Sequence, residues 1–252
     1  MKIIAVVNQK GGCGKTTSCV NISAGLAMQG KRVLLIDLDP QASATSVFYQ
    51  DDPEKSAYDV IVDEMPISSA IIKTSIKGLD ILPSDIMLSG ADLRLSSVIG
   101  REKKLKNAIF KTGLEYDFII IDTPPSLSIL TVNALTCANE IYVPINMSFF
   151  ALKGVKLLEE TITQVKENLD NPEIQISRVL PTMFDPVTNV SKDVEQMIRD
   201  YFKEKVFQTK IHINVKLEEA HSNQQTIFQY DPNSKGANQY WKLTEEILNH
   251  GN

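Results

Sequence analysis

The residues best suited to chemistry begin in the first loop, N-Q-K-G-G-C-G-K-T-T, at residues 8–17. Its stretch Gly14-Lys15-Thr16 matches the end of the phosphate-binding pattern G-x-x-x-x-G-K-[ST], but Gln9 stands where that pattern has its first glycine. The N–H groups of a glycine-rich turn and the N-terminus of the next helix together attract phosphate oxygens. We therefore predict a nucleotide site in which Lys15 neutralises the β- and γ-phosphates and Thr16 binds Mg²⁺.

A glycine turn without any ligand is the ordinary alternative for such a loop. The order of buried strand, loop and helix, together with the run G-K-T-T, argues against it. Cys13 occupies a position of the pattern where any residue is allowed. We interpret it as a small side chain that the loop tolerates, in preference to a redox-active thiol.

A second stretch, I-D-L-D-P-Q at residues 36–41, follows an apolar run and carries two carboxylates. Side chains one residue apart on an extended segment point to opposite faces, so we expect only one of Asp37 and Asp39 to reach a bound nucleotide. Asp39 lies further out and precedes the turn-forming Pro40. It is therefore the better candidate for holding or polarising a water molecule.

The third stretch, F-I-I-I-D-T-P-P at residues 118–125, is an apolar strand that ends in Asp122. Phosphate-loop enzymes present a second metal-side carboxylate in this way, directly or through a metal-bound water. The loop Thr123-Pro124-Pro125 has restricted backbone angles and would face the γ-phosphate, which suits a segment that reports the nucleotide state.

The elements that position these residues alternate along the whole chain. Apolar runs predict buried strands at 3–7, 32–36, 79–82, 118–121, 140–143 and 176–180. Helical spacing predicts helices at 15–28, 92–99, 102–111, 128–138, 152–168, 191–203 and 239–248. This alternation is typical of an α/β, doubly wound, mostly parallel sheet with helices on both faces, and with no linker or repeat we expect one domain over 1–252. Ligands of such sheets bind beyond the carboxyl ends of the strands, where the three stretches lie.

The composition excludes several classes of protein. The chain of 252 residues is 43% hydrophobic and 23% charged, which is typical of a globular protein, and it has no apolar run of membrane-spanning length. A net charge of −5 argues against nucleic-acid binding over the whole surface. The three cysteines form no C-x-x-C pair and the three histidines are scattered, so we expect reduced thiols and no zinc site. Because residues 1–10 lead into the glycine loop without a signal-peptide cleavage region, we expect a cytoplasmic location.

The three stretches together resemble the deviant Walker-type ATPases of the ParA/MinD group, closest to the short chromosomal ParA (Soj-like) proteins. The resemblance also covers N-A-L-T-C-A at 133–138 and Y-D-P-N-S-K-G-A at 230–237. It implies a P-loop ATPase that hydrolyses ATP slowly with Mg²⁺, closes into an ATP-dependent homodimer and drives chromosome or plasmid partitioning. It also implies a ParB-like centromere-binding partner, non-specific DNA binding and association with the nucleoid in the ATP state.

The same resemblance assigns roles to individual residues. Lys10 is the signature lysine of the family, and it crosses to the nucleotide of the partner subunit. Asp39 assists the attacking water, Asp122 supports Mg²⁺, and Lys10 and Lys15 complete the catalytic set. The metal group is Thr16, Asp39 and Asp122, and the ATP-binding group is Lys10, Gly11, Gly12, Cys13, Gly14, Lys15, Thr16 and Thr17, with Met183 and Asn214 near the adenine.

The chain also departs from the family pattern. Where the family often has I-P-R-N-V-R, residues 211–216 read I-H-I-N-V-K, and Val187 stands where relatives can carry an arginine associated with DNA. The sequence therefore supports the prediction of DNA binding less strongly than the prediction of ATP binding. A C-terminal basic patch remains a candidate DNA site, with solvated lysines as an equal alternative; its members are Lys203, Lys205, Lys210, Lys216 and Lys235.

Other readings of the resemblance remain open. A MinD-like membrane switch needs a basic amphipathic helix at the end of the chain, whereas residues 240–252 hold one lysine and two glutamates. We therefore expect a helix that docks on the fold and no membrane partner. A ParA-like ATPase that positions a protein assembly fits the sequence as well as a DNA-partitioning one does. A metal-cluster reductase is disfavoured, because Cys137 is typical of an ordinary buried thiol.

Overall fold

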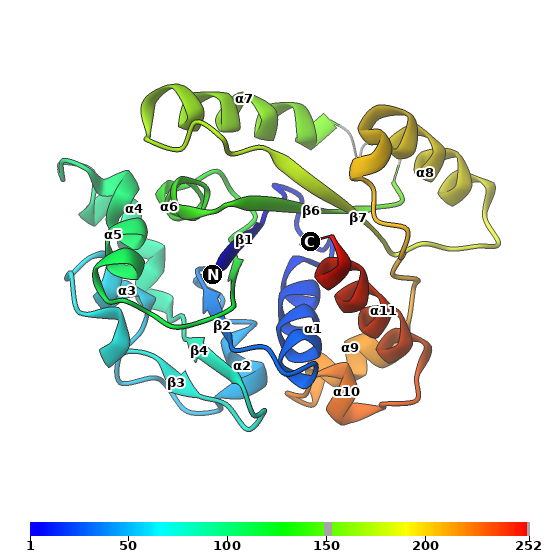
Figure 1. Cartoon of the computed structure of the whole chain (residues 1–252), viewed down its shortest axis with the longest axis horizontal. Helices are drawn as coiled ribbons and strands as arrows, with labels where there is room; N and C mark the ends of the chain where they lie inside the picture. The colour runs from blue at the N-terminus through cyan, green and yellow to red at the C-terminus, as the bar shows by residue number, and fades with distance from the viewer. Residues whose placement is uncertain (149–152, 251–252) are drawn as a thin grey trace.

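A seven-stranded sheet forms the centre of the molecule, a computed structural model that describes residues 1–148 and 153–250 (Figure 1). The strand order is β3-β4-β2-β5-β1-β6-β7, and neighbours are parallel except for β3 and β4. The strands are β1 (Lys2–Val6), β2 (Val33–Asp37), β3 (Ile72–Lys73), β4 (Leu79–Leu82), β5 (Phe118–Asp122), β6 (Glu140–Asn146) and β7 (Ile176–Thr182). The predicted fold class and all six predicted strands are confirmed, whereas the short β3 was missed.

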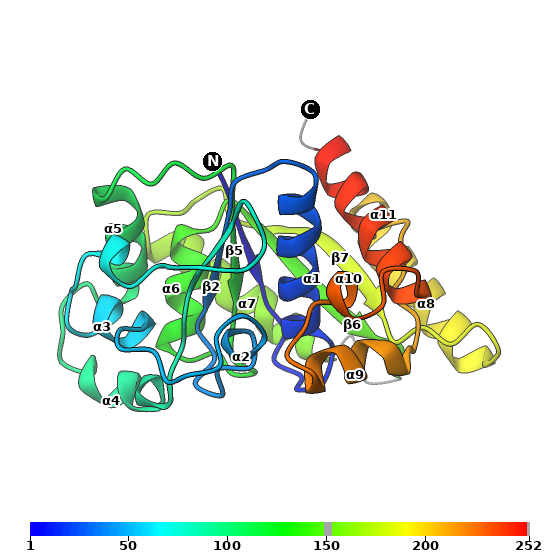
Figure 2. The same cartoon turned by 90° about the horizontal axis from the view of Figure 1, so that it is seen from below.

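Helices cover both faces of the sheet, as the sequence predicts (Figures 1 and 2). Alternate residues of β1 feed two separate cores: Ile3 and Ala5 pack with α3 to α8, whereas Ile4 and Val6 pack with α1, α9 and α11. The helices are α1 (Lys15–Met28), α2 (Thr45–Phe48), α3 (Ala57–Ile61), α4 (Ala91–Arg94), α5 (Lys104–Lys111), α6 (Ile129–Cys137), α7 (Lys153–Asn168), α8 (Asn189–Phe202), α9 (Val215–Ser222), α10 (Ile227–Tyr230) and α11 (Lys235–Asn249). Short 3₁₀ helices lie at η1 (Ile67–Ser69), η2 (Ile86–Gly90), η3 (Arg101–Lys103) and η4 (Lys203–Lys205).

The helix predicted at 92–99 is wrong in length, because α4 ends at Arg94. Leu93 and Ile99 are 80% and 98% exposed, so the apolar spacing does not correspond to a buried face. The hydroxyl of Ser96 donates to the carbonyl oxygen of Leu93 at 2.8 Å, an alternative partner that competes with helix continuation. The prediction for 152–168 holds from Lys153 onward, and its first residue lies outside the described part of the chain.

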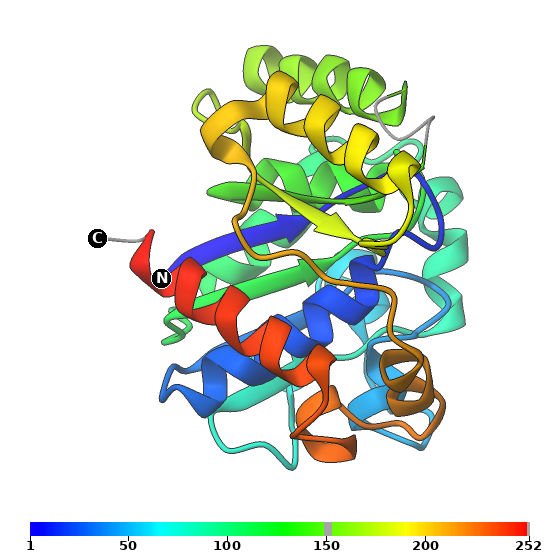
Figure 3. The same cartoon turned by 90° about the vertical axis from the view of Figure 1, so that its right-hand side faces the viewer.

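The C-terminal helix α11 packs along α1, as Figure 3 shows from the side. Leu243 and Ile247 are buried on this contact, and the hydroxyls of Tyr240 and Ser18 lie 3.2 Å apart. The docking helix predicted from the tail is therefore confirmed for the residues described, up to 250. Within 1–148 and 153–250 we find no helix with the length and apolar character needed to cross a membrane.

The turn before β4 supplies a test of the fold. Gly78 has φ +89°, and a Cβ placed on it would lie 2.9 Å from the backbone oxygen of Lys31, which cannot move aside. Gly100 has φ +72° with open space around its Cβ position, so it isolates the cost of the left-handed backbone. We expect Gly100→Ala to lower the free energy of unfolding by about 1 kcal/mol and Gly78→Ala by about 3 kcal/mol. Urea denaturation of both variants measures the difference, and equal losses would contradict the proposed contact.

Candidate nucleotide site

The glycine loop connects the end of β1 to the start of α1. Gly12 and Gly14 have φ values of +68° and +84°, a left-handed backbone that favours glycine, and Gly14 precedes the first residue of the helix. Gly11 and Gly12 are exposed, and a Cβ at either position would meet no atom within 4 Å, so this part of the loop is open to solvent. Lys15 is buried behind the loop. A left-handed glycine backbone directly before a helix N-terminus is the geometry expected of a phosphate-binding loop.

The loop is also anchored to its neighbours. The hydroxyl of Thr182 at the end of β7 donates to the carbonyl oxygen of Cys13 at 2.9 Å. The side chain of Asn8 donates to the carbonyl oxygen of Pro144 in β6 at 2.6 Å, and it accepts from the N–H of Lys10 at 3.0 Å. Burial raises the pKa of the Cys13 thiol, which favours the protonated form and a packing role for this residue.

The exposed side chain of Lys10 folds back onto its own chain. Its ammonium group donates to the amide oxygen of Asn146, the last residue of β6, at 3.2 Å and to the hydroxyl of Ser148, two residues further on, at 2.6 Å. In this single chain the lysine therefore rests on neutral oxygen acceptors, at the edge of the sheet where the glycine loop lies.

The carboxylate that ends β2, Asp37, and the one two residues later, Asp39, have different surroundings. Asp37 is fully buried, and it accepts hydrogen bonds from the N–H of Asp39 and from both the N–H and the hydroxyl of Thr45, at 2.8 to 3.0 Å. Asp39 is partly exposed and accepts from the N–H of Gln41 at 3.0 Å. Only Asp39 is therefore open to a ligand or a water molecule, while Asp37 organises the turn.

Ser84, which the sequence pattern does not indicate, holds the backbone of Asp39 in place. The hydroxyl of Ser84, after β4, donates to the backbone oxygen of Asp39 at 2.6 Å, and its N–H donates to the hydroxyl of Thr45 at 2.8 Å. Thr45 begins α2 and Ser84 lies in the loop after β4, so spacing along the chain gives no signal for their contact.

Asp122 ends β5 as a fully buried carboxylate. Its backbone pairs in register with Asp37 of β2, and the thiol of Cys19 lies 3.5 Å from its Oδ1. Burial, and next the charge of Asp37, raise the pKa of Asp122, whereas Thr16 and Lys15 act in the opposite direction. Its Oδ2 atom is buried, and among residues 1–148 and 153–250 it has no hydrogen-bond partner. A buried acid with a free oxygen is suited to a cation.

A cavity of about 420 Å³ opens beside the glycine loop and brings together residues distant in the sequence. Gly14 and Thr17 of the loop and first helix turn line it together with Met183 and Asn214. Met183 has a left-handed φ of +51°, and Asn214 caps α9 by accepting from the N–H of Lys216. The size is that of a small-molecule site. His212 and Tyr240 also line the cavity, and neither was singled out as a base contact from the sequence.

The five lysines of the candidate DNA patch have different roles in the structure. The ammonium of Lys210 lies 2.6 Å from a carboxylate oxygen of Glu195 and 4.5 Å from the ring centre of Phe184. Lys216 lies 2.8 Å from Glu219, and Lys205 donates to Gln175 at 3.3 Å. Lys203 lies in η4 and Lys235 begins α11, and both are exposed. The charges of Lys210 and Lys216 are therefore matched within the fold, which disfavours a patch built on all five.

This fold and site define a P-loop ATPase, and comparison with known proteins narrows the class. A family model described as an AAA domain matches residues 1–176. The chain is 44% identical to the sporulation initiation inhibitor protein Soj of Bacillus subtilis over 252 residues, covering 99% of both chains. It is 38% identical to the chromosome partitioning protein ParA of Caulobacter vibrioides, covering 98% of this chain and 94% of that protein.

A solved structure extends the comparison to the fold. A protein from Mycobacterium smegmatis, described as cobyrinic acid a,c-diamide synthase and solved with ADP and magnesium, superimposes with a TM-score of 0.85. It is 35% identical to this chain, and the match covers 100% of this chain and 95% of that one. The chain belongs to the Soj/ParA family of ATPases.

Thr45 provides a test of the support under Asp39. In Thr45→Val the side chain keeps its shape, but Asp37 loses a donor and the N–H of Ser84 loses its acceptor, all within the protein interior. We expect the free energy of unfolding to fall by about 1 to 3 kcal/mol and ATP hydrolysis to fall with it, because the turn that carries Asp39 loosens.

Thr45→Ser is the matched control, since it keeps the hydroxyl and should retain most of the activity. Chemical denaturation and phosphate release measure the two effects. If the valine variant matched the serine variant in both, the hydrogen bonds of Thr45 would not support the site.

Proposed function

We propose that this chain binds ATP and Mg²⁺ at the glycine loop, closes into an ATP-dependent homodimer, and partitions chromosomal or plasmid DNA. In the proposed cycle the dimer binds DNA without reading its sequence, associates with the nucleoid, and is released when a ParB-like partner stimulates hydrolysis. The observation that carries this proposal is the convergence of the glycine loop, Asp39 and Asp122 on one edge of the sheet, beside a cavity of about 420 Å³.

The residues at this edge fit Mg²⁺. Asp122 has a buried oxygen without a partner, and Thr16 lies in the first helical turn after the glycine loop. Mg²⁺ prefers hydroxyl and carboxylate oxygens, often through its own water molecules, so Thr16 would bind it directly and Asp122 and Asp39 would support its shell. A bound Mg²⁺ supplies charge neutralisation on the β- and γ-phosphate oxygens.

The protein groups divide the remaining work of hydrolysis. The N–H groups of Gly11 to Thr17 bind the phosphates, and Lys15 stabilises the charge that develops on them. Asp39 orients the attacking water and accepts its hydrogen bond, which its partly exposed carboxylate allows. Met183 and Asn214 contact the adenine in the cavity.

Dimer closure assigns a role to Lys10. Two facing nucleotides repel each other, and a lysine that crosses from each subunit supplies the charge that permits closure. Lys10 is exposed at the same edge of the sheet as the glycine loop, and its present partners are uncharged.

A second candidate cargo is a protein assembly positioned by the same ATPase cycle. The observation that favours it is the pairing of Lys210 and Lys216 with Glu195 and Glu219, which leaves less free positive charge for DNA. A membrane role has less support, because α11 buries its apolar face on the fold.

The cargo is tested by a gel-shift assay with DNA of unrelated sequence in the presence of ATP or ADP. We expect binding only with ATP, and a steep loss of affinity as salt rises, because non-specific binding depends on phosphate contacts. Equally weak binding in both nucleotide states at low salt would exclude DNA as the cargo and favour the protein assembly.

The dimer step is tested by three variants studied with light scattering and nucleotide binding. We expect Lys10→Ala to bind ATP but to stay monomeric, and Lys15→Ala to lose nucleotide binding. Asp39→Ala should remain a dimer in ATP, with hydrolysis reduced by about 100-fold or more, because the group that orients the water is lost. A Lys10→Ala protein that dimerises normally, or an Asp39→Ala protein found only as a monomer, would contradict the respective role.

A further inference from the structure

The segment 207–214 forms one wall of the proposed adenine cavity. It runs beside the end of β7: the N–H of Phe207 donates to Val179 at 3.0 Å, and the N–H of Ile211 donates to Pro181 at 2.9 Å. Further along, Phe184 and Ile211 to Ile213 exchange backbone hydrogen bonds of 3.0 and 3.2 Å. His212, Ile213 and Asn214 of this segment then line the cavity. The shape of the cavity therefore depends on how firmly the segment is held.

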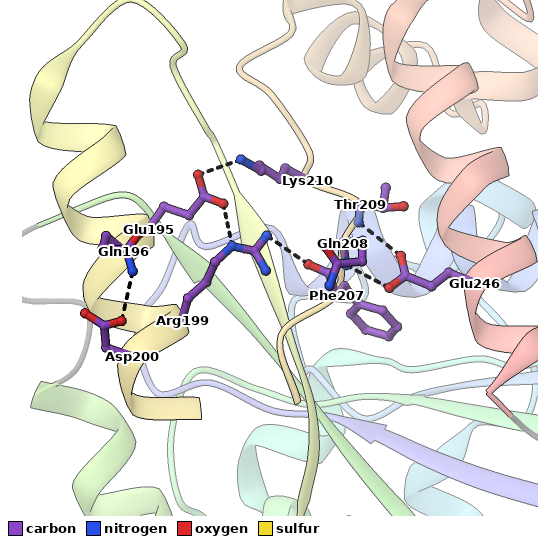
Figure 4. Close-up of polar contacts among 9 residues, drawn as sticks. All are labelled: Glu195, Gln196, Arg199, Asp200, Phe207, Gln208, Thr209, Lys210 and Glu246. Atoms are coloured by element: carbon purple, nitrogen blue, oxygen red, sulfur yellow. Dashed lines mark hydrogen bonds and ion pairs between the residues drawn. The ribbon is translucent and has the colours of Figure 1, made fainter. Parts of the chain in front are cut away.

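Two helices brace the segment from opposite sides, as Figure 4 shows. On one side, Glu246 of α11 accepts the N–H groups of Gln208 and Thr209 at 2.7 and 3.0 Å. On the other side, Arg199 of α8 donates to the backbone oxygen of Phe207 at 3.3 Å. Gln239 of α11 adds a contact at the cavity, accepting the N–H of His212 at 3.1 Å.

Glu195 is the centre of the brace from α8. One carboxylate oxygen accepts from Arg199 at 2.8 Å, and the other lies 2.6 Å from the ammonium of Lys210. Glu195 is only 8% exposed, so the two charge-assisted bonds are shielded from solvent. Burial by itself would raise the pKa of Glu195, but the bonds from Lys210 and Arg199 lower it below its ordinary value. The group is therefore charged at neutral pH.

Lys210 carries the effect of Glu195 to the cavity wall. Its ammonium lies over the ring of Phe184, and that ring packs edge-on against His212 with 5.3 Å between ring centres. Phe184 directly follows Met183, which lines the cavity, and His212 lines it from the segment 207–214. The contacts of Phe184 with Lys210 and His212 therefore connect the two segments that form this wall. Cation–π and edge-to-face contacts fix ring orientation as well as distance.

We propose that Glu195 is a positioning residue for the base of the bound nucleotide: through Lys210 and Arg199 it holds the segment 207–214 in the conformation that accepts the purine. It contacts no nucleotide atom itself. This inference rests on the proposed placement of the adenine in the cavity. It also gives Lys210 a structural role in place of DNA binding, and it makes α8 a helix whose displacement would change nucleotide affinity.

The test compares ATP with inorganic triphosphate by calorimetry in the presence of Mg²⁺, because triphosphate occupies the phosphate loop without entering the base cavity. Glu195→Gln keeps the shape of the side chain and removes its charge. We expect ATP binding to weaken about five- to tenfold, because the fraction of chains with a competent base wall falls, while triphosphate binding stays unchanged.

Asp193→Asn is the matched control, since it removes one negative charge from an exposed position of the same helix. It should leave both affinities at the wild-type value. Lys210→Met should reproduce the loss of ATP affinity, and Lys210→Arg should largely restore it by keeping the charge. These two variants keep the proposal testable if Glu195→Gln folds poorly, which thermal melting reports.

The outcomes separate this inference from the proposed function. If the wild type bound ATP no more tightly than triphosphate, the placement of the base would be wrong, and the brace would lose its role with it. If the wild type preferred ATP and Glu195→Gln preferred it to the same degree, only the brace would be wrong. An equal loss for ATP and triphosphate would indicate a general structural effect and would also overturn the positioning role.

Discussion

Two buried carboxylates in register, Asp37 and Asp122, constrain the rest of the site. They end the neighbouring strands β2 and β5 and are fully buried. Burial raises the pKa of both carboxyls, and the charge of Asp37 raises the pKa of Asp122 further. Removing two like charges from water is costly unless partners offset it. Asp37 meets this cost with three hydrogen-bond donors, whereas Asp122 keeps a free oxygen next to Lys15 and the first turn of α1. A cation that accompanies a polyphosphate would offset the charge of this acid, so the arrangement that costs folding energy favours binding of the cation together with its ligand.

Much of this arrangement follows from local sequence patterns. Four apolar residues before Asp122 predict β5, and the glycine spacing predicts the loop, because each depends on neighbours along the chain. The hydrogen bonds of Thr45 to Asp37 and Ser84 join the end of β2, the start of α2 and the loop after β4. It depends on the order of the strands in the sheet, and no spacing along the chain encodes it. The misjudged helix at 92–99 has the same origin, since an apolar pattern indicates a buried face only if the fold covers it.

The lysines show most clearly which contacts a sequence pattern cannot predict. From the sequence, Lys210 and Lys216 are equally compatible with a basic DNA-binding patch and with solvated lysines balanced by nearby acidic residues. The structure pairs Lys210 with Glu195, fifteen positions earlier and on another element, and places it over an aromatic ring. A cation held at two contacts, each partly shielded, would lose both on turning to a phosphate backbone. The net charge argues against nucleic-acid binding over the whole surface, and the pairing of Lys210 argues further against a DNA site that includes this lysine.

Lys10 presents the opposite case. Its ammonium rests on a serine hydroxyl and an amide oxygen, both uncharged and both partly exposed, at the end of β6 and two residues beyond it. Hydrogen bonds from an ammonium to neutral acceptors are weaker than those to a phosphate oxygen, and exposure to water weakens them further. A lysine held in this way is ordered near the loop, yet it is released at small cost when a more negative acceptor approaches. Lys10 and Lys210 thus differ in the charge and burial of their acceptors, which is the physical basis for expecting one lysine to move during the ATP cycle and the other to stay.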